Sequence, residues 1–348
     1  MSAPKKVDYL IVGQGLAGSV LSFNLLKRGK SIIVIDDNQP NTSSKVAAGL
    51  YNPITGRKMI KTWMADTLFP LIEPFYNELQ KWCDEPVLNP IGIYRPFVDN
   101  AEQNEWSAKA EDSEYKSFVK QVHTKSFLKG AFDDFGGLSL QPSGYVDVAC
   151  LLNGVAKKLE TADCLCRETF EEKHLILGDN QVEYRGIKAP RIVFCTGLGS
   201  ISFFEWLPFR PVKGEVLEIK SDIELNTILN RGVFIIPRGR DRYKLGATYN
   251  WKDLTINVSK KGKENLISKF QALINGSVEV VAEDAGIRPA TPDRRPLIGS
   301  HPDDNRLVCF NGLGSKGVSL APYFSGHLID HLEKGIDLMP EVNISRYY

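Results

Sequence analysis

The stretch VDYLIVGQGLAGSVLSFNLLKRGKSIIVID, Val7–Asp36, has the pattern of a strand, a helix and a second strand. A short apolar run opens it, glycines follow, and apolar residues then recur at helical spacing as far as Gly29. A second apolar run ends at Asp36. Short, continuous apolar runs are typical of strands buried in a parallel sheet. The stretch therefore predicts a β-α-β unit.

Three glycines separate the first strand from the helix. Gly13, Gly15 and Gly18 form the pattern G-x-G-x-x-G. The first glycine permits the tight turn, the second lets backbone approach a pyrophosphate, and the third lets the helix pack on the strand. Phosphates are favoured there because the first N–H groups of a helix are free. With Asp36 positioned to accept hydrogen bonds from a ribose, the motif predicts a dinucleotide cofactor and leaves NAD and FAD open.

The overall composition is that of a globular protein. The chain has 348 residues, 43% of them hydrophobic and 24% charged, and a formal net charge of +1. This length suits two domains, and the charge gives no general attraction to nucleic acid or to a membrane. Neither a membrane span nor a signal peptide is predicted, so we expect a cytoplasmic protein. No metal site is predicted, because His327 and His331 are four residues apart without a third ligand.

The rest of the chain alternates between two patterns. A helix at Gly144–Glu160, a strand at Ala189–Ser200 and a strand, glycine loop and helix at Arg306–Gly335 continue the pattern of the opening unit. Between them, short strands are predicted at Pro211–Ser221 and Arg242–Asn250, separated by turns, which favours a mainly antiparallel sheet. We therefore expect an α/β (α+β) fold with two domains.

The first domain is predicted to be Rossmann-like and to bind the nucleotide, and the second to bind the substrate. The nucleotide-binding domain is expected to be discontinuous and to comprise residues 1–75, 140–208 and 286–348. The substrate-binding domain is expected to comprise residues 76–139 and 209–285.

Six motifs occur along the chain in the order found in one family of flavoproteins. They are GQGLAG (Gly13–Gly18), SSKVAAGLYNP (Ser43–Pro53), GYVDVACL (Gly144–Leu151), CTGLGS (Cys195–Ser200), GIRPATPDRRPLIG (Gly286–Gly299) and GLGSKGVSLAP (Gly312–Pro322). Over nearly its whole length the sequence resembles the D-amino-acid oxidase superfamily of FAD-dependent oxidoreductases. The resemblance is strongest to the glycine oxidase and D-amino-acid dehydrogenase branch, and it extends to sarcosine oxidases. It favours FAD over NAD.

The resemblance implies that FAD lies between the two domains. The residues implied to bind it are Gly13, Gly15, Leu16, Ala17, Gly18, Asp36, Asp37, Ser44, Ala48, Gly49, Leu50, Gly197, Leu313, Gly314, Ser315, Lys316 and Gly317. Sarcosine oxidases carry a cysteine that tethers the flavin shortly before the T-P-D motif, and Gly286 stands at that position here. We therefore expect FAD to be held non-covalently.

Two further residues are assigned through the resemblance. Arg288 matches the arginine that holds the substrate carboxylate in this family, and a guanidinium suits that task because its planar fork meets both carboxylate oxygens. Lys244 matches the catalytic lysine of sarcosine oxidases that assists oxygen near flavin N5, although a strand lysine facing solvent remains an equal alternative. Phe234 replaces the tyrosine that helps to hold the carboxylate in glycine oxidases.

The function implied is oxidation of the C–N bond of a small amine that bears a carboxylate, such as a D-amino acid, glycine or an N-alkyl glycine. Hydride transfer to flavin N5 would be followed by reoxidation by oxygen or a quinone. AAGLYNPI and LGSKG also resemble the flavin domain of the bacterial bifunctional enzyme that removes carboxymethyl from a tRNA wobble uridine. A tRNA partner is therefore a second hypothesis, and a flavoprotein without catalytic activity is a third. Arg57, Lys58 and Lys61 fit either an anionic substrate or an exposed basic face.

Overall fold

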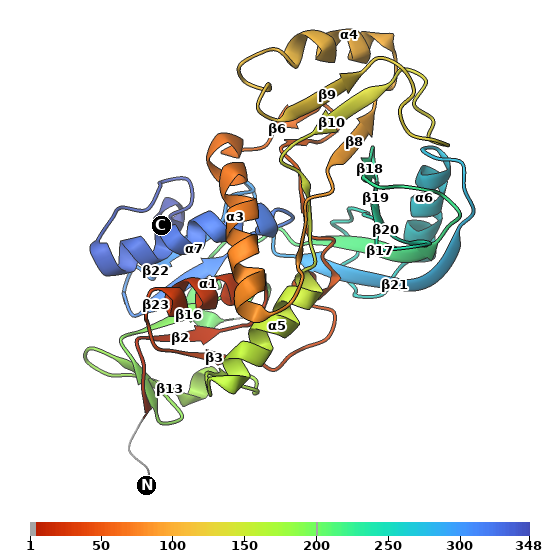
Figure 1. The fold of residues 1–348 in the computed structure, drawn as a ribbon. Helices are drawn as coiled ribbons and strands as arrows, with labels where there is room; N and C mark the ends of the chain where they lie inside the picture. The colour runs from red at the N-terminus through yellow and green to blue at the C-terminus, as the bar shows by residue number, and fades with distance from the viewer. Residues whose placement is uncertain (1–4, 200) are drawn as a thin grey trace.

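A six-stranded sheet contains the N-terminal unit in the computed structural model, which describes residues 5–199 and 201–348 (Figure 1). In spatial order its strands are β12 (Leu165–Cys166), β3 (Ile32–Ile35), β2 (Tyr9–Val12), β16 (Arg191–Phe194), β23 (Leu307–Asn311) and β22 (Leu297–Ser300). Neighbouring strands are parallel, except that β22 is antiparallel to β23. Strands β2 and β3, with helix α1 (Leu16–Lys27) between them, confirm the predicted β-α-β unit.

Helices pack on one face of this sheet and a smaller sheet packs on the other. The helices are α1, α3 (Ala65–Cys83), α5 (Val148–Thr161) and α7 (Gly317–Lys334). The smaller sheet consists of β1 (Lys5–Lys6), β15 (Ile187–Ala189), β14 (Val182–Tyr184) and β13 (Leu175–Leu177). Helices α5 and α7 confirm two helices predicted from their apolar spacing, but α5 begins at Val148 and not at Gly144, because Gly144–Val146 pairs with neighbouring strands as β11. Within the described residues, no helix is both long enough and apolar enough to cross a membrane.

An eight-stranded sheet forms the second half of the molecule (Figure 1). In spatial order its strands are β21 (Glu279–Arg288), β17 (Val212–Lys220), β20 (Arg242–Gly246), β19 (Phe234–Pro237), β18 (Ile228–Asn230), β8 (Ile93–Pro96), β10 (Gly137–Leu140) and β9 (Val119–His123). Strands β18 and β8 are parallel, and the other neighbours are antiparallel. Helix α6 (Lys260–Gln271) packs on one face of the sheet. The mainly antiparallel second sheet is confirmed.

The remaining elements are short. They are α2 (Ser43–Val46), β4 (Leu50–Tyr51), β5 (Ile54–Thr55), β6 (Ile60–Lys61), β7 (Leu88–Asn89), α4 (Asn100–Lys109), β11 (Gly144–Val146) and the 3-10 turns Glu172–His174, Ser202–Phe204 and Ile344–Tyr347. Strands β4, β11 and β7 form a three-stranded sheet, and β5 pairs with β6 as a hairpin.

The expected domain limits fall inside two of these elements. The limit expected after residue 75 lies within α3, which packs against α7 and α5 beside the six-stranded sheet. The limit expected before residue 286 lies within β21, which pairs with β17 as far as Arg288. The edge strand of the antiparallel sheet therefore ends at the arginine of the R-P-x-T-P-D motif. The limits themselves stay a prediction.

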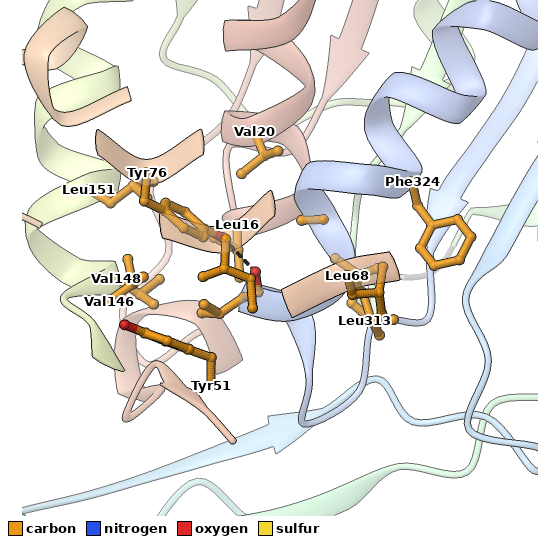
Figure 2. Close-up of a cluster of buried hydrophobic side chains, with 14 of the residues drawn as sticks. Leu16, Val20, Tyr51, Leu68, Tyr76, Val146, Val148, Leu151, Leu313 and Phe324 are labelled. Atoms are coloured by element: carbon orange, nitrogen blue, oxygen red, sulfur yellow. Dashed lines mark hydrogen bonds between the residues drawn. The ribbon is translucent and has the colours of Figure 1, made fainter. Parts of the chain in front are cut away.

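A buried tyrosine of α3 supplies a hydrogen bond that a proline removes from α7. Pro322 lies inside α7 and has no N–H, so the carbonyl of Val318, four residues earlier, lacks its usual helical donor. The Tyr76 hydroxyl donates to this carbonyl at 3.0 Å (Figure 2). Burial raises the pKa of Tyr76, so its hydroxyl keeps its proton and stays a donor. This bond joins α3 to the start of α7, next to the glycine loop that precedes it.

We predict that Tyr76→Phe lowers the free energy of unfolding by about 1–3 kcal/mol, because it leaves the buried Val318 carbonyl unpaired. Urea denaturation measures the loss. Tyr347→Phe is the control, since that hydroxyl bonds the exposed carboxylate of Asp293; it should cost less than about 0.5 kcal/mol. Equal losses in the two variants would contradict the role given to Tyr76.

Candidate active site

A cavity of about 1900 Å³ lies between the two large sheets, where β2, β3 and β16 end. The predicted cofactor residues that line it are Gly13, Gly15, Leu16, Ala17, Asp36, Asp37, Ser44, Ala48, Gly49, Leu50, Gly197, Leu313, Gly314, Ser315, Lys316 and Gly317. Gly18 belongs to the same predicted set but lies within α1, outside the lining. The structure thus brings together loops that are up to 300 positions apart in sequence, as Gly13 and Leu313 illustrate. Their contact with a cofactor stays a prediction.

The turn from β2 into α1 has no room for side chains. Gly13 has a φ of +98°, and a Cβ at this position would lie 2.6 Å from the carbonyl oxygen of Cys195. A Cβ on Gly18 would lie 1.9 Å from the carbonyl oxygen of Gly13. The start of α1 has no capping side chain at Gly15 and no acidic residue in its first turn. Such a helix start fits a pyrophosphate, because N–H groups and the helix dipole both favour an anion.

Asp36 closes the same end of the cavity. One carboxylate oxygen accepts a hydrogen bond from the N–H of Gln14 at 2.7 Å, and the other accepts one from the N–H of Asn38 at 2.8 Å. Each carboxylate oxygen has a second lone pair, so the side chain can still accept from a ribose hydroxyl. Asp36 therefore holds the glycine turn and faces the expected position of the ribose. Together with the helix start, it makes this end of the cavity fit FAD.

Arg288 lines the cavity at the end of β21. Its Nη1 atom lies 3.5 Å from the carbonyl oxygen of Lys213 and 3.4 Å from that of Thr248. Burial lowers the pKa of Arg288, and the neighbour that opposes this shift is Tyr249 rather than a carboxylate. Within residues 5–199 and 201–348, the guanidinium therefore faces the cavity without an acidic partner.

A glycine makes the position of Arg288 possible. Gly214 lies on the neighbouring strand β17, and a Cβ there would lie 1.9 Å from Nη2 of Arg288. The ring of Tyr249 flanks the guanidinium, with 4.5 Å between the ring centroid and Cζ. Tyr249 lines the cavity and is 57% exposed, so it lies at the mouth. The guanidinium is thus held between a bare backbone and an aromatic ring.

The two other sequence-assigned residues of this sheet differ in position. Phe234 lines the cavity, and its ring occupies the space over Gly246, where a Cβ would lie 2.7 Å from it. Lys244 is buried on β20 but is not among the cavity-lining residues, and its Nζ lies 3.7 Å from a carboxylate oxygen of Glu218. Burial lowers the pKa of Lys244 and Glu218 opposes this. This burial excludes the alternative that Lys244 is a strand lysine facing solvent. The action of Lys244 on oxygen stays a prediction.

A different lysine reaches the cavity. Lys316 comes directly before α7, and its Nζ donates to the hydroxyls of Thr55 at 3.4 Å and Thr62 at 3.2 Å. Burial and the neighbouring Arg294 and Arg295 lower the pKa of Lys316 to about 8. Lys316 is therefore a cation that loses its charge within a readily accessible pH range.

Several cavity-lining residues lie outside the sequence-based assignments. Tyr249, Arg95 and Arg231 line the cavity, but no recognised motif contains them. Of the basic residues left open by the sequence, Arg57 and Lys61 line the cavity and Lys58 does not. Lys61 forms an ion pair with Asp66 at 2.7 Å. The sequence gives no signal for Arg95, because its strand lies outside every recognised motif and 39 positions from Gly56, whose carbonyl it bonds.

Comparison with known proteins agrees with this geometry. Residues 8–332 match the DAO family model, described as FAD dependent oxidoreductase. Glycine oxidase of Bacillus subtilis is 31% identical over 58% of this chain and 57% of its own length. A bifunctional tRNA 5-methylaminomethyl-2-thiouridine biosynthesis protein of Leptospira interrogans is 25% identical over 97% of this chain, which spans 59% of that protein. The crystal structure of glycine oxidase from Geobacillus kaustophilus superposes with a TM-score of 0.76 at 22% identity, covering 96% of each chain.

We predict that Asp36→Ala weakens FAD binding by on the order of 1.5–3 kcal/mol, because charged hydrogen bonds to the ribose and to the turn are lost. Titration of the apoprotein with FAD, followed by flavin fluorescence, measures this change. Asp163→Ala is the control, since that carboxylate pairs with Lys5 on the surface away from the cavity. An unchanged FAD affinity in Asp36→Ala would assign the ribose to another residue.

We predict that the holoenzyme binds acetate more weakly as pH rises through about 8, the pKa of Lys316. The protonated side chain attracts an anion and the neutral one does not. At an effective dielectric constant near 20, the loss of one unit charge in the same cavity is worth on the order of 1 kcal/mol, or several-fold in affinity. Spectral titration of the flavin between pH 7 and 9 measures it. Lys316→Arg should abolish the pH dependence and keep the affinity for acetate. Lys316→Met should abolish the pH dependence and lower that affinity. A change of affinity near pH 8 that persists in both variants would exclude Lys316 as its cause.

Proposed function

Because the chain belongs to the DAO family of FAD-dependent oxidoreductases, we propose that it oxidises the C–N bond of a small amine that carries a carboxylate. The substrate class includes glycine, N-alkyl glycines and D-amino acids. The observation that carries this proposal is Arg288, a partly buried guanidinium that faces the cavity and has no acidic partner in the described part of the chain. A buried cation without a counter-ion is costly, and a substrate carboxylate removes that cost.

The protein's own contribution is orientation. When bound, FAD would supply the hydride acceptor for oxidation of the α-carbon of an amine, and the imine product would be open to hydrolysis by water. Arg288 would hold the carboxylate by two hydrogen bonds and so fix the α-carbon at one distance from the cofactor. Gly214 keeps the space that Arg288 occupies. Phe234 presents an apolar ring where a second polar anchor is expected from the resemblance, so binding of the carboxylate depends on Arg288 more strongly.

Tyr249 supports the same task from the opposite side. Its ring flanks the guanidinium at the mouth of the cavity, where it restricts the motion of Arg288 and covers part of it from water. The electron acceptor is oxygen or a quinone. Lys244 would favour oxygen only if its side chain turned from Glu218 toward the cavity. Rates of reoxidation by oxygen and by a soluble quinone, in wild type and in Lys244→Met, distinguish the two acceptors.

A second candidate substrate is carboxymethyl-modified tRNA. It is favoured by the likeness to the Leptospira tRNA-modification protein over 97% of this chain and by basic residues at the cavity, of which Arg57 and Arg294 are exposed. The proposed function is tested by an anaerobic screen of glycine, N-methylglycine, D-alanine and carboxymethylated tRNA, scored by bleaching of the flavin. Bleaching by tRNA alone would favour the second candidate. Bleaching by none of them would overturn both.

We predict that Arg288→Ala lowers the efficiency of flavin reduction by a carboxylate-bearing amine by about 2–5 kcal/mol, because the carboxylate enters a desolvated site without its partner. Arg288→Lys should recover only part of this, since a point charge cannot form the two-pronged contact. Stopped-flow reduction of the holoenzyme measures both. FAD content should be unchanged in each variant.

A glycine substitution tests whether the position of the Arg288 side chain matters when its charge is kept. Gly214→Ala keeps Arg288 but places a Cβ 1.9 Å from its Nη2, so it should reduce activity as Arg288→Lys does. Gly326→Ala is the matched control, because a Cβ there meets its first neighbour at 3.6 Å, an ordinary contact. Wild-type rates in Arg288→Ala would remove Arg288 from substrate binding.

A further inference from the structure

We propose that Lys213 and Asp253 are positioning residues for the carboxylate site. Their ion pair holds residues 247–259, here called the strap, so that the ring of Tyr249 stays against Arg288. The proposal rests on the proposed function only in taking Arg288 as the carboxylate anchor. It assigns control of substrate affinity to two side chains that lie outside the cavity lining.

The strap runs from the end of β20 to the start of α6 and lies beside β17. The N–H of Lys213 donates to the carbonyl oxygen of Asn250 at 2.9 Å, and the N–H of Asn250 donates back to the carbonyl oxygen of Lys213 at 3.1 Å. The N–H of Thr248 donates to the carbonyl oxygen of Glu215 at 3.2 Å. These bonds place the strap next to Gly214, the residue between Lys213 and Glu215.

Arg288 reaches across Gly214 to the strap. Strand β17 pairs with β21 on one side and lies beside the strap on the other. The guanidinium covers the bare backbone of Gly214, where a Cβ would lie 1.9 Å from Nη2. Beyond it, the ring of Tyr249 lies 4.5 Å from Cζ, and the carbonyl oxygen of Thr248 lies 3.4 Å from Nη1. A shift of the strap therefore moves two of the groups that surround the guanidinium.

The side chain of Lys213 fastens the middle of the strap. It is fully buried, and its Nζ donates to Oδ2 of Asp253 at 2.6 Å and to Oγ1 of Thr255 at 3.3 Å. The Lys213 ammonium lowers the pKa of Asp253 to about 2, so the pair stays ionised at neutral pH. A buried ammonium is unfavourable without a partner, so Lys213 favours the position of the strap in which Asp253 meets it.

Glu215 fastens the two ends of the strap. Its side chain is buried, and Oε2 accepts a hydrogen bond from the hydroxyl of Thr248 at 2.8 Å. Oε1 accepts one from the N–H of Ser259 at 2.7 Å, and Ser259 caps the start of α6. Lys213 and Glu215, which flank Gly214, thus hold the strap at its start, middle and end.

The apolar side chains of the strap cannot replace these polar contacts. Tyr249, Trp251, Leu254 and Ile256 are all exposed, so their burial contributes little to holding the segment. The position of the Tyr249 ring therefore depends on the polar contacts with β17. If the ring moves, the guanidinium of Arg288 gains freedom that a bound carboxylate must then remove, and the carboxylate binds more weakly.

The test is titration of the holoenzyme with acetate, followed by the flavin spectrum. Asp253→Asn keeps the size of the side chain and removes its charge, so it should raise the Kd for acetate about three- to tenfold. Lys213→Met should do the same, and Asp253→Glu should recover part of the affinity. Glu224→Gln is the control, because it removes an exposed ion pair with Lys129 outside the lining, and it should leave the Kd unchanged.

The rate of flavin reduction distinguishes positioning from damage to the fold. At saturating amine, the limiting rate should change less than about twofold in these variants, because none of the altered side chains touches the reacting atoms. Asp253 is 34% exposed, so Asp253→Asn should retain FAD even if Lys213→Met does not.

A double-mutant cycle tests whether Asp253 acts through Tyr249. In Tyr249→Ala the ring is absent, so adding Asp253→Asn should raise the Kd for acetate by less than about twofold more. An equal increase with and without Tyr249, a wild-type Kd in Asp253→Asn, or no acetate binding in wild type would overturn the positioning role. Those outcomes leave the proposed function intact if an amine bleaches the flavin. Coupling between Asp253 and Tyr249 without bleaching by any amine would overturn the proposed function alone.

Discussion

The close approach of three backbone segments at Gly13, Gly18 and Cys195 is the constraint on which the cavity depends. No side chain fits at Gly13 or Gly18, so the helix starts directly against the sheet, and the N–H of its first residue, Leu16, donates to Oγ of the cavity-lining Ser44 at 3.0 Å. Asp36 fastens the same turn through the N–H of Gln14. From this end the cavity continues to the eight-stranded sheet, where Arg288 and Phe234 line it. The position of the substrate site follows from that direction.

Charge is distributed unevenly along the cavity. Among the described lining residues, the acids are Asp36, Asp37 and Glu168, all at the end where β3 and β12 stop. Arg167 lies 3.7 Å from Asp36 at this end, whereas the described part of the lining beside the eight-stranded sheet has arginines and no acid. This distribution supports the proposed carboxylate-bearing substrate, since a cation shielded from water requires an anion. It also explains the low pKa of Lys316, because burial and the neighbouring guanidinium groups both disfavour the charged form of this lysine.

Two lysines illustrate the limit of assignment by motif. Lys244 lies in a segment that resembles the one carrying the oxygen-assisting lysine of sarcosine oxidases. Its ammonium, however, faces Glu218, and Lys244 is not a cavity-lining residue. Lys316 lies in the glycine loop before α7, and its ammonium reaches the cavity between Thr55 and Thr62. The direction of a long side chain depends on the partners that the fold supplies. A motif records only the residue type and its place along the chain.

The segment that contains Arg288 was assigned through its resemblance to a family motif. Local pattern determined the β-α-β unit, the glycine turn and the acid at Asp36, which follow from residue type and spacing. These features depend on neighbours within about thirty positions, which periodicity and turn chemistry describe. Only the tertiary structure brought Tyr249 beside Arg288, placed Gly214 beneath it and left Arg95 facing the cavity with an unused donor. Strand order and burial decide such contacts, and both arise from packing between segments that are remote in sequence.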